Sequence, residues 1–192
     1  MSRHTLARRG GRFGLRPVAG EDADFIFRLR IDPELSRYLN PVPPELAAQE
    51  VWLTEYYKRP NDYYFCIIDE VTRERHGTIS LYNVDPAAGT AEMGRWILRR
   101  GSLAAAESAL LIYTIGFEDL TLRRVYCRTV SANKAVVAFH RSCGLQLVDE
   151  SEKLVLGGVA YGITKQSLDD AIWPEVAAKL KRVSAMASGL LS

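Results

Sequence analysis

The sequence predicts a mixed α/β (α+β) fold, with one mostly antiparallel sheet of about seven strands and helices on both faces. Three strand-like segments, residues 63–69, 77–84 and 90–98, follow one another with hairpin-type turns between them. A strand–helix–strand–helix–strand run comes next, and this order favours a single mixed sheet. A helical segment at 102–118 links the strands at 90–98 and 123–130. We therefore expect these two strands to be parallel and joined by a right-handed crossover.

The first 60 residues predict one strand and two helices. Residues 13–18 are strand-like, and the next segment has apolar residues at helical spacing with acids at its N-terminal end. The apolar positions of this helix are Phe25, Ile26, Leu29 and Ile31. The helix ends at Asp32-Pro33, because proline disfavours helical backbone in the residue before it. Pro43-Pro44 then starts a second helix over 45–59.

Helices and strands alternate in the C-terminal half. The helix at 102–118 has an apolar stripe at helical spacing. Its members are Leu103, Ala106, Leu110, Tyr113 and Phe117. Apolar and polar residues alternate along the strand at 123–130. Ser131 is expected to cap the N-terminus of a helix over 132–142, which Gly144 ends. The remaining elements are two late strands at 145–149 and 153–164, which form a hairpin through Gly157-Gly158, and an amphipathic helix from Pro174.

Length and composition restrict the class of protein. The chain has 192 residues, of which 47% are hydrophobic, and this suits one domain with a sizeable core. We expect a disordered basic start at 1–12, a single domain at 13–174, and a C-terminal helix and tail at 175–192. The net charge of +2 gives no reason to expect binding to nucleic acid or membranes. No apolar run approaches the roughly 18 residues that span a bilayer.

The cysteines and the N-terminus indicate the compartment. The three cysteines are scattered without paired or metal-type spacing, so we expect neither disulfides nor a bound metal. The first residues lack the apolar core of a secretory signal. The sequence therefore favours a cytoplasmic protein, either a monomer or a homodimer.

A basic, glycine-containing turn carries the clearest chemical signal. Arg99-Arg100-Gly101-Ser102 leads from a strand into a helix. The first backbone N–H groups of that helix and its positive dipole end suit a phosphate or pyrophosphate. The alternative is an ordinary turn with solvated arginines. His76, in another charged turn, is expected to be solvated as well.

Further features occur in the order and spacing of one known family. The segment Ala-Glu-Met-Gly-Arg-Trp-Ile at 91–97 precedes the turn, and a helix beginning near Asn133 follows it with the spacing Asn-x-Ala. Leu15-Arg16-Pro17 and Asp32-Pro33-Glu34 stand where the family has them. Across residues 13–174 the chain resembles the GNAT superfamily of acyl-CoA N-acyltransferases. Within that superfamily it resembles the subgroup of ribosomal-protein N-terminal and amino-sugar acetyltransferases.

The resemblance implies acetyl-CoA as cosubstrate and a splayed pair of parallel strands that receives it. Matching Glu107 to a glutamate of the family places Arg100 and Ala105 on its phosphate-turn motif. Leu103 departs from the motif, which has glycine there, and we expect its side chain to point into the core. The residues implied in binding CoA are Ile97, Leu98, Arg99, Arg100, Gly101, Ser102, Leu103, Ala104, Ala105 and Asn133. A backbone N–H near Ile97 or Leu98 is implied as the oxyanion donor.

Asn133 and His140 are the two helix residues implied in the reaction. Asn133 would contact the pantetheine arm, and the alternative for it is a capping role. His140 lies two helical turns further on, where many relatives have a tyrosine that protonates the departing thiolate. An ordinary histidine pKa near 6.5 suits that role at neutral pH. The alternative for His140 is a structural, hydrogen-bonded side chain.

Glu92 is the one acid within its strand and could take the proton of the incoming amine, or pair with a neighbouring arginine. The residues expected to contact the acceptor are Tyr38, Asn40, Tyr56 and Asn83. We expect a small-molecule amine, an amino-sugar nucleotide first, as the acceptor. The alternatives are a peptide amine, as in acetylation of a ribosomal-protein N-terminus, and a non-catalytic CoA-binding module.

Overall fold

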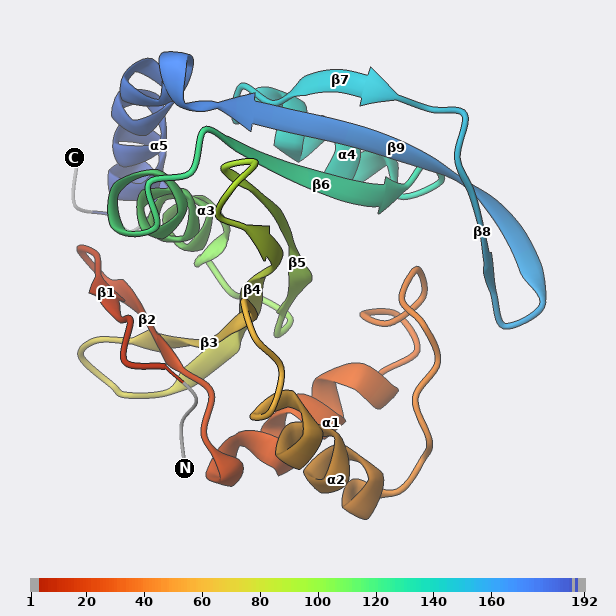
Figure 1. The fold of residues 1–192 in the computed structure, drawn as a ribbon. Helices are drawn as coiled ribbons and strands as arrows, with labels where there is room; N and C mark the ends of the chain where they lie inside the picture. The colour runs from red at the N-terminus through yellow and green to blue at the C-terminus, as the bar shows by residue number, and fades with distance from the viewer. Residues whose placement is uncertain (1–3, 188, 190–192) are drawn as a thin grey trace.

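A computed structural model describes residues 4–187 and 189. Within them the strands form one sheet in the order β1-β2-β3-β4-β5-β6-β9-β7, and β8 pairs with β9 outside this path (Figure 1). The strands are β1 (Arg8–Arg9), β2 (Phe13–Pro17), β3 (Tyr63–Asp69), β4 (Arg75–Asp85), β5 (Thr90–Leu98), β6 (Arg124–Val130), β7 (Gln146–Asp149), β8 (Lys153–Leu156) and β9 (Val159–Asp169). Every pairing is antiparallel except that of β5 with β6, which confirms the predicted mixed sheet.

Helices cover both faces of this sheet. They are α1 (Ala23–Ile31), α2 (Leu46–Tyr56), α3 (Ala105–Thr114), α4 (Lys134–Ser142) and α5 (Trp173–Ala187), with short helical turns at Gly20–Asp22, Ile115–Asp119 and Asp170–Ile172. Strand β3 shows how the two faces are filled, because successive side chains of a strand point to opposite sides. Phe65 and Ile67 join the core under α3 and α5, whereas Cys66 and Ile68 join the core under α1 and α2.

The parallel pair separates after a short contact. Thr90–Glu92 of β5 pair with Arg124–Tyr126 of β6, and the ladder then stops although both strands continue. The cause lies on the other side of β5. Thr78 and Ser80 of β4 pair with Ile97 and Gly94 of β5, so one residue of β4 lies opposite two residues of β5. Arg95 is in this bulge and has a positive φ of 48°. A bulge bends its strand, so β5 turns away from β6 and opens the sheet.

Some boundaries differ from the sequence-based expectations. Strand β1 was not expected. The strand expected at 153–164 is divided into β8 and β9, and β9 continues to Asp169. The helix expected from Ser102 begins at Ala105, because Ser102 closes a turn in which its N–H donates to the carbonyl of Arg99 (3.2 Å). The helix expected after Ser131 has Asn133 as its N-cap instead, whereas the Ser131 hydroxyl hydrogen-bonds to Thr164 (2.9 Å).

The expected disorder at 1–12 does not extend to the residues described. Strand β1 pairs with β2, and Arg8 forms an ion pair with Asp119. The buried carboxylate of Glu107 accepts backbone N–H groups from Gly11, Arg12 (3.2 Å) and Phe13 (3.1 Å). Three backbone donors on one carboxylate fasten this segment to the start of α3. Residues 1–3 lie outside the described part of the chain.

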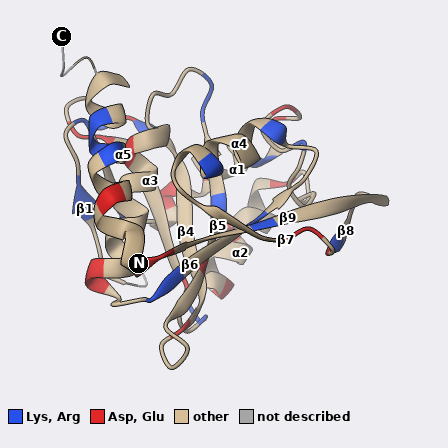
Figure 2. Cartoon of the chain, turned by 90° about the horizontal axis from the view of Figure 1, so that it is seen from above, with Lys and Arg blue, Asp and Glu red and all other residues tan. Residues whose placement is uncertain are grey.

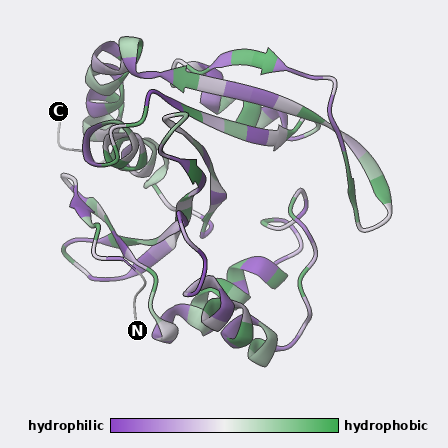
Figure 3. Cartoon of the chain, in the orientation of Figure 1, coloured by the Kyte–Doolittle hydropathy of each residue, from purple (hydrophilic) through white to green (hydrophobic). Residues whose placement is uncertain are grey.

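Charged and hydrophobic residues are spread over many elements of the fold (Figure 2 and Figure 3). Basic and acidic residues alternate over the elements (Figure 2), as expected for a net charge of +2. The end of the β8–β9 hairpin carries hydrophobic residues (Figure 3), among them the exposed Val155 and Val159. In the described part of the chain, no helix combines the length and apolarity needed to cross a membrane.

Candidate active site

A cleft of about 260 Å³ opens where β5 and β6 separate. Its lining comes from the end of α1, the loop that follows, strands β4 to β6, helix α4 and the β8–β9 hairpin. Five predicted site residues line it: Tyr38, Asn40, Glu92, Asn133 and His140. The fold thus brings together residues that are up to about a hundred positions apart in the chain.

Two segments meet across the mouth of the cleft. Tyr38, from the loop after α1, packs edge-to-face against Tyr161 of β9, with ring centroids 6.2 Å apart. Pro41 lies beside Gly157 at the tip of the β8–β9 hairpin. In Figure 1 the loop after α1 accordingly reaches toward the hairpin. These two contacts are called the roof below.

Glu92 occupies the point where the two strands begin to separate. The residue is 4% exposed, and its carboxylate accepts hydrogen bonds from the Tyr82 hydroxyl (2.7 Å) and the Asn83 amide (3.4 Å). The Arg128 guanidinium lies 4.0 Å away. Burial, followed by the Glu92 charge, raises the pKa of Tyr82, so its phenol stays protonated and donates. A carboxylate held in this way is preorganised to accept a proton from a group in the cleft.

His140 faces the same cleft from the last turn of α4. It is 3% exposed and packs against Trp96, with ring centroids 5.7 Å apart. Burial lowers the pKa of His140 to about 4. The expectation of an ordinary histidine pKa was therefore wrong, because desolvation disfavours the imidazolium. The ring is therefore neutral at pH 7 in the free protein.

Asn133 combines the capping role with a place at the cleft. Its Oδ1 accepts the N–H of Val136 (3.4 Å), which satisfies one of the free donors at the start of α4. The alternative of a capping asparagine is therefore observed. Since the cap uses Oδ1, and the residue also lines the cleft, its amide nitrogen remains a donor for a ligand.

The basic turn at 99–102 forms a second, adjacent site. Gly101 has a φ of 72°, a conformation that glycine adopts without strain. The N–H groups of Gly101 and Leu103 have no hydrogen-bond acceptor among the described residues. Leu103 is 50% exposed, and Ala104 occupies the core instead, so the expected inward Leu103 was wrong. Free donors at a helix N-terminus remain suited to a phosphate.

The arginines of this turn are not simply solvated. Arg99 donates to Glu74 (2.8 Å) and to the Nε2 atom of His76 (2.8 Å), and Arg100 pairs with Asp32 (3.1 Å) and Glu34 (2.6 Å). These carboxylates hold both guanidinium groups at the turn and would share them with a bound anion.

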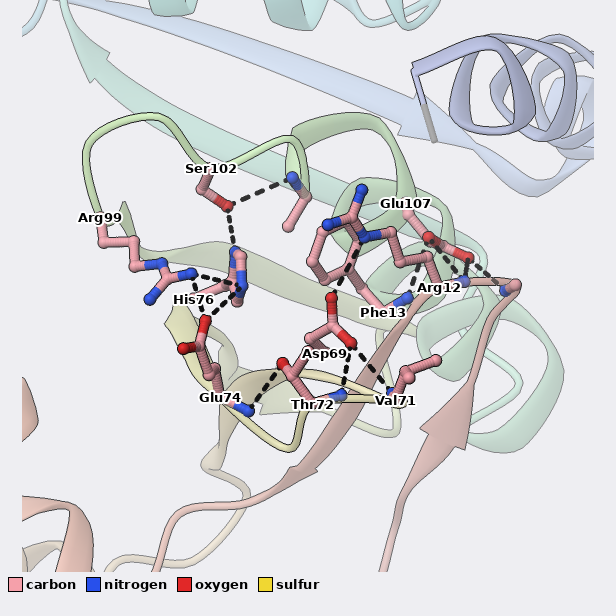
Figure 4. Close-up of polar contacts among 12 residues, drawn as sticks. Arg12, Phe13, Asp69, Val71, Thr72, Glu74, His76, Arg99, Ser102 and Glu107 are labelled. Carbon is pink, nitrogen blue, oxygen red and sulfur yellow. Dashed lines mark hydrogen bonds and ion pairs between the residues drawn. The ribbon is translucent and has the colours of Figure 1, made fainter. Parts of the chain in front are cut away.

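His76 braces the turn, and the expectation that it is solvated was wrong. Its buried ring lies between Arg99 and Ser102, with Nδ1 3.0 Å from the Ser102 hydroxyl (Figure 4). Because Arg99 donates to Nε2, the ring proton is on Nδ1 and is donated to Ser102. Burial and the Arg99 charge lower the pKa of His76, which keeps the ring neutral. No sequence motif indicated this contact, because strand β4 brings His76 to Ser102 from 26 residues earlier in the chain.

Two other predicted acceptor residues lie elsewhere. Tyr56, the last residue of α2, is fully buried, its hydroxyl accepts the N–H of Tyr64 (2.9 Å), and it does not line the cleft. Asn83 is exposed beside the cleft and reaches it only through its bond to Glu92.

The cleft also contains charged residues that the sequence did not single out: Arg30, Arg95 and Arg128. Arg95 makes two hydrogen bonds to the buried Asp62 (2.6 and 2.8 Å), and its guanidinium lies 4.5 Å from the ring centroid of Tyr82. Arg95 belongs to the segment at 91–97 that resembles the family, but the sequence of that segment does not indicate the positive φ that places Arg95 in the bulge.

A mostly antiparallel sheet that splays at one parallel pair, beside a helix N-terminus with free donors, defines the class of acyl-CoA N-acyltransferases. The chain belongs to the family described as "Acetyltransferase (GNAT) domain", whose model matches residues 12–146. The protein is therefore a GNAT acetyltransferase, and this family uses acetyl-CoA.

Known relatives agree with this family. The chain is 28% identical over 144 residues to an uncharacterized N-acetyltransferase p20 of Bacillus licheniformis, covering 70% of this chain and 79% of that one. Among solved structures, FdhC, a nucleotide-linked sugar GNAT, has a TM-score of 0.80 at 25% identity, covering 94% of this chain and 99% of that one. A GCN5-related N-acetyltransferase from Brucella melitensis has a TM-score of 0.81 at 22% identity, covering 93% and 85%.

A more distant neighbour has bound ligands. Spermidine N-acetyltransferase from Vibrio cholerae, in complex with CoA and spermine, has a TM-score of 0.77 at 16% identity, covering 86% of this chain and 99% of that one. At this level of identity the likeness concerns the fold alone.

Proposed function

We propose that the protein transfers the acetyl group of acetyl-CoA to the primary amine of a small molecule in the cleft between β5 and β6. The observation that carries this proposal is the convergence of Glu92, Asn133 and His140 on one cleft where two parallel strands separate. The pyrophosphate of CoA would bind the free N–H groups of Gly101 and Leu103. The pantetheine arm would run past Asn133 along β5, with a backbone N–H near Ile97 or Leu98 as oxyanion donor.

Glu92 and His140 divide the proton movements of this reaction. The amine nitrogen bonds to the acetyl carbon and the carbon–sulfur bond breaks. Glu92 accepts the amine proton, directly or through a water molecule. His140, neutral at pH 7, offers its ring N–H to the departing sulfur. This hydrogen bond stabilises the negative charge on the thiolate, which then takes a proton from solvent, while the proton on Glu92 is released to solvent.

Replacing His140 with phenylalanine should lower kcat roughly 10- to 100-fold, because one hydrogen bond to a charged atom is lost while the ring volume is kept. The affinity for CoA should stay nearly unchanged. His140→Tyr is the matched control, since its hydroxyl restores a donor, and it should recover part of the rate. A fully active His140→Phe enzyme would assign the residue to packing.

The same histidine gives a pH prediction. With a folded pKa of about 4, His140 should not titrate between pH 5 and 8. Its carbon-bound ring proton should keep a constant NMR shift across that range. The pKa of His140 is lower in the folded state than in the unfolded state, so between these two pKa values the unfolded state binds the proton more readily. The free energy of unfolding should therefore be highest above pH 6.5 and should decrease as the pH falls from about 6.5 to 4. A midpoint near 6.5 would contradict the burial argument.

Replacing Arg99 and Arg100 together with alanine should weaken CoA binding roughly tenfold and reduce its dependence on salt, because the two guanidinium groups add charge-assisted bonds at the turn. Isothermal titration calorimetry at two salt concentrations measures both effects. The control is the double variant Arg28→Ala/Arg182→Ala, which removes the same charge from exposed positions. Equal CoA affinity in both double variants would contradict the proposal that the pyrophosphate of CoA binds at this turn.

The acceptor we propose is an amino-sugar nucleotide. The 25% identical structural relative FdhC, a nucleotide-linked sugar GNAT, supports this choice. The hydroxyl and amide groups of Tyr38 and Asn40 in the cleft would suit sugar hydroxyls. The alternative acceptor is a peptide N-terminus.

Release of free thiol from acetyl-CoA, measured side by side with UDP- and dTDP-linked amino sugars, spermidine and short peptides, tests the proposal. The highest kcat/KM is expected for an amino-sugar nucleotide. A much higher value for a peptide would replace the proposed acceptor, and the absence of thiol release with any of these amines would contradict it.

A further inference from the structure

The three arginines of the cleft differ in what they contact. Arg95 is paired with Asp62, and Arg128 is paired with Glu152 and lies near Glu92. Arg30 forms no ion pair with any carboxylate in the described residues 4–187 and 189. Arg30 therefore brings a positive charge to the cleft that the protein itself does not neutralise.

The position of Arg30 leaves one of its donors unused. Arg30 is the second-to-last residue of α1. Its Nη2 atom donates to the backbone carbonyl of Asn40 (2.6 Å), and this bond orients the side chain. Its Nε atom is removed from solvent and has no hydrogen-bond acceptor among the described residues. A buried donor without an acceptor is destabilising, because its lost hydration is not replaced. Because Arg30 also lines the cleft and forms no ion pair in the described part of the chain, an oxyanion placed there can accept from its guanidinium group.

The charges around Arg30 indicate the sign of that ligand. Burial is the main cause that lowers the pKa of Arg30; Tyr64 opposes this shift and the nearby Arg95 adds to it. The ionised side chains that line the cleft are three arginines and one glutamate, and the glutamate already accepts from Tyr82. A planar guanidinium with a free Nε–H is suited to the oxygen atoms of a phosphate or carboxylate.

We propose that Arg30 binds an oxyanion of the acetyl acceptor, so that the acceptor is an amine that also carries a phosphate or carboxylate group. This inference rests on the proposed function of the cleft as the site of amine acetylation. It predicts that a polyamine, which carries only positive charge, is a poor substrate, because like charges in the cleft oppose its binding.

Calorimetry on protein saturated with CoA tests the inference, because CoA then fills the turn at 99–102. Inorganic pyrophosphate and glutarate are the two probes, and they distinguish a phosphate-type from a carboxylate-type oxyanion. At least one should bind the wild-type protein, and Arg30→Met should weaken that binding roughly 10- to 100-fold. Arg30→Lys keeps the charge but lacks the Nε–H, so it should fall between the two.

Arg28→Met is the matched control. Arg28 lies on the same helix, is exposed and is paired with Asp24, so its replacement should leave the anion affinity unchanged. If neither probe binds the CoA-saturated protein, or if Arg30→Met binds both as well as wild type does, the inference is wrong.

Kinetics separate this inference from the proposed function. With an anionic acceptor, Arg30→Met should raise the KM for the acceptor and leave the KM for acetyl-CoA unchanged. A rise in the KM for acetyl-CoA alone would assign Arg30 to the cosubstrate and overturn the inference. If the enzyme acetylates spermidine but not anionic amines, the proposed acetyl transfer is supported and the inference that Arg30 binds an oxyanion is wrong. Binding of pyrophosphate without turnover of any amine would reject the proposed function instead.

Discussion

Glu92→Gln should lower kcat roughly 10²–10⁴-fold, the largest effect on activity that we expect from a single substitution. The amide has nearly the shape of the carboxylate but does not accept a proton at neutral pH. Glu92 lies at the point where β5 leaves β6, and the Tyr82 hydroxyl fixes its carboxylate from one side. The KM for acetyl-CoA should change little, because no part of the turn at 99–102 contacts Glu92.

Glu152→Gln is the matched control for this prediction. Both glutamates lie near the Arg128 guanidinium, but Glu152 does not line the cleft. Steady-state kinetics should therefore show a large loss for Glu92→Gln and nearly full activity for Glu152→Gln. Equal losses in the two variants would mean that the position of Arg128, and not a base at Glu92, controls the rate.

Asp62→Ala should destabilise the fold by about 3–5 kcal/mol, because it leaves the Arg95 guanidinium partly buried without its counter-charge. Asp62 is buried and makes both short hydrogen bonds to Arg95. Arg95 also packs over the rings of Trp52, Tyr64 and Tyr82. Arg95 lies in the bulge and lines the cleft, so activity should fall with stability. Urea denaturation measures the free energy of unfolding.

Two further variants identify the cause of that loss. Asp62→Ala/Arg95→Met removes both charges and should regain part of the lost stability, as replacement of a whole buried pair often does. Asp24→Ala removes the exposed partner of Arg28 and should cost less than about 1 kcal/mol. If the double variant is no more stable than Asp62→Ala, the loss comes from packing and not from the unpaired charge.

The periodicity of the sequence was sufficient to predict the architecture of the fold. Alternating and helical apolar patterns located the central strands and the five main helices, because burial of one face controls those positions. The pattern did not reveal β1, because a two-residue strand has no periodicity. It is held by pairing with β2 and by the ion pair of Arg8 with Asp119, and the Glu107 carboxylate accepts the N–H groups of the turn that follows it. Helix starts shifted by a few residues, since the choice between Ser131 and Asn133 as a cap depends on the Thr164 hydroxyl of β9.

The candidate site was predictable only where a local motif exists. Glu92, Asn133 and His140 were found from their spacing, and the structure brings them to one cleft. Burial lowers the pKa of His140, and the residues next to it in the sequence do not indicate that it is buried. Arg30 was missed for a similar reason: an arginine on a helix is ordinary in sequence, and its unused Nε–H becomes evident only when Asn40 and Arg95 surround it.

The roof has a consequence for how the kinetics should be read. It consists of an edge-to-face contact between Tyr38 and Tyr161 and the approach of Pro41 to Gly157, and no backbone ladder joins the two segments in the described part of the chain. Loops that close over enzyme clefts move over microseconds to milliseconds. Enzymes typically turn over about 1 to 10³ times per second. We therefore expect the mouth of the cleft to open many times during each catalytic cycle. Acceptor exchange then stays close to equilibrium, and the KM for the acceptor approximates its dissociation constant.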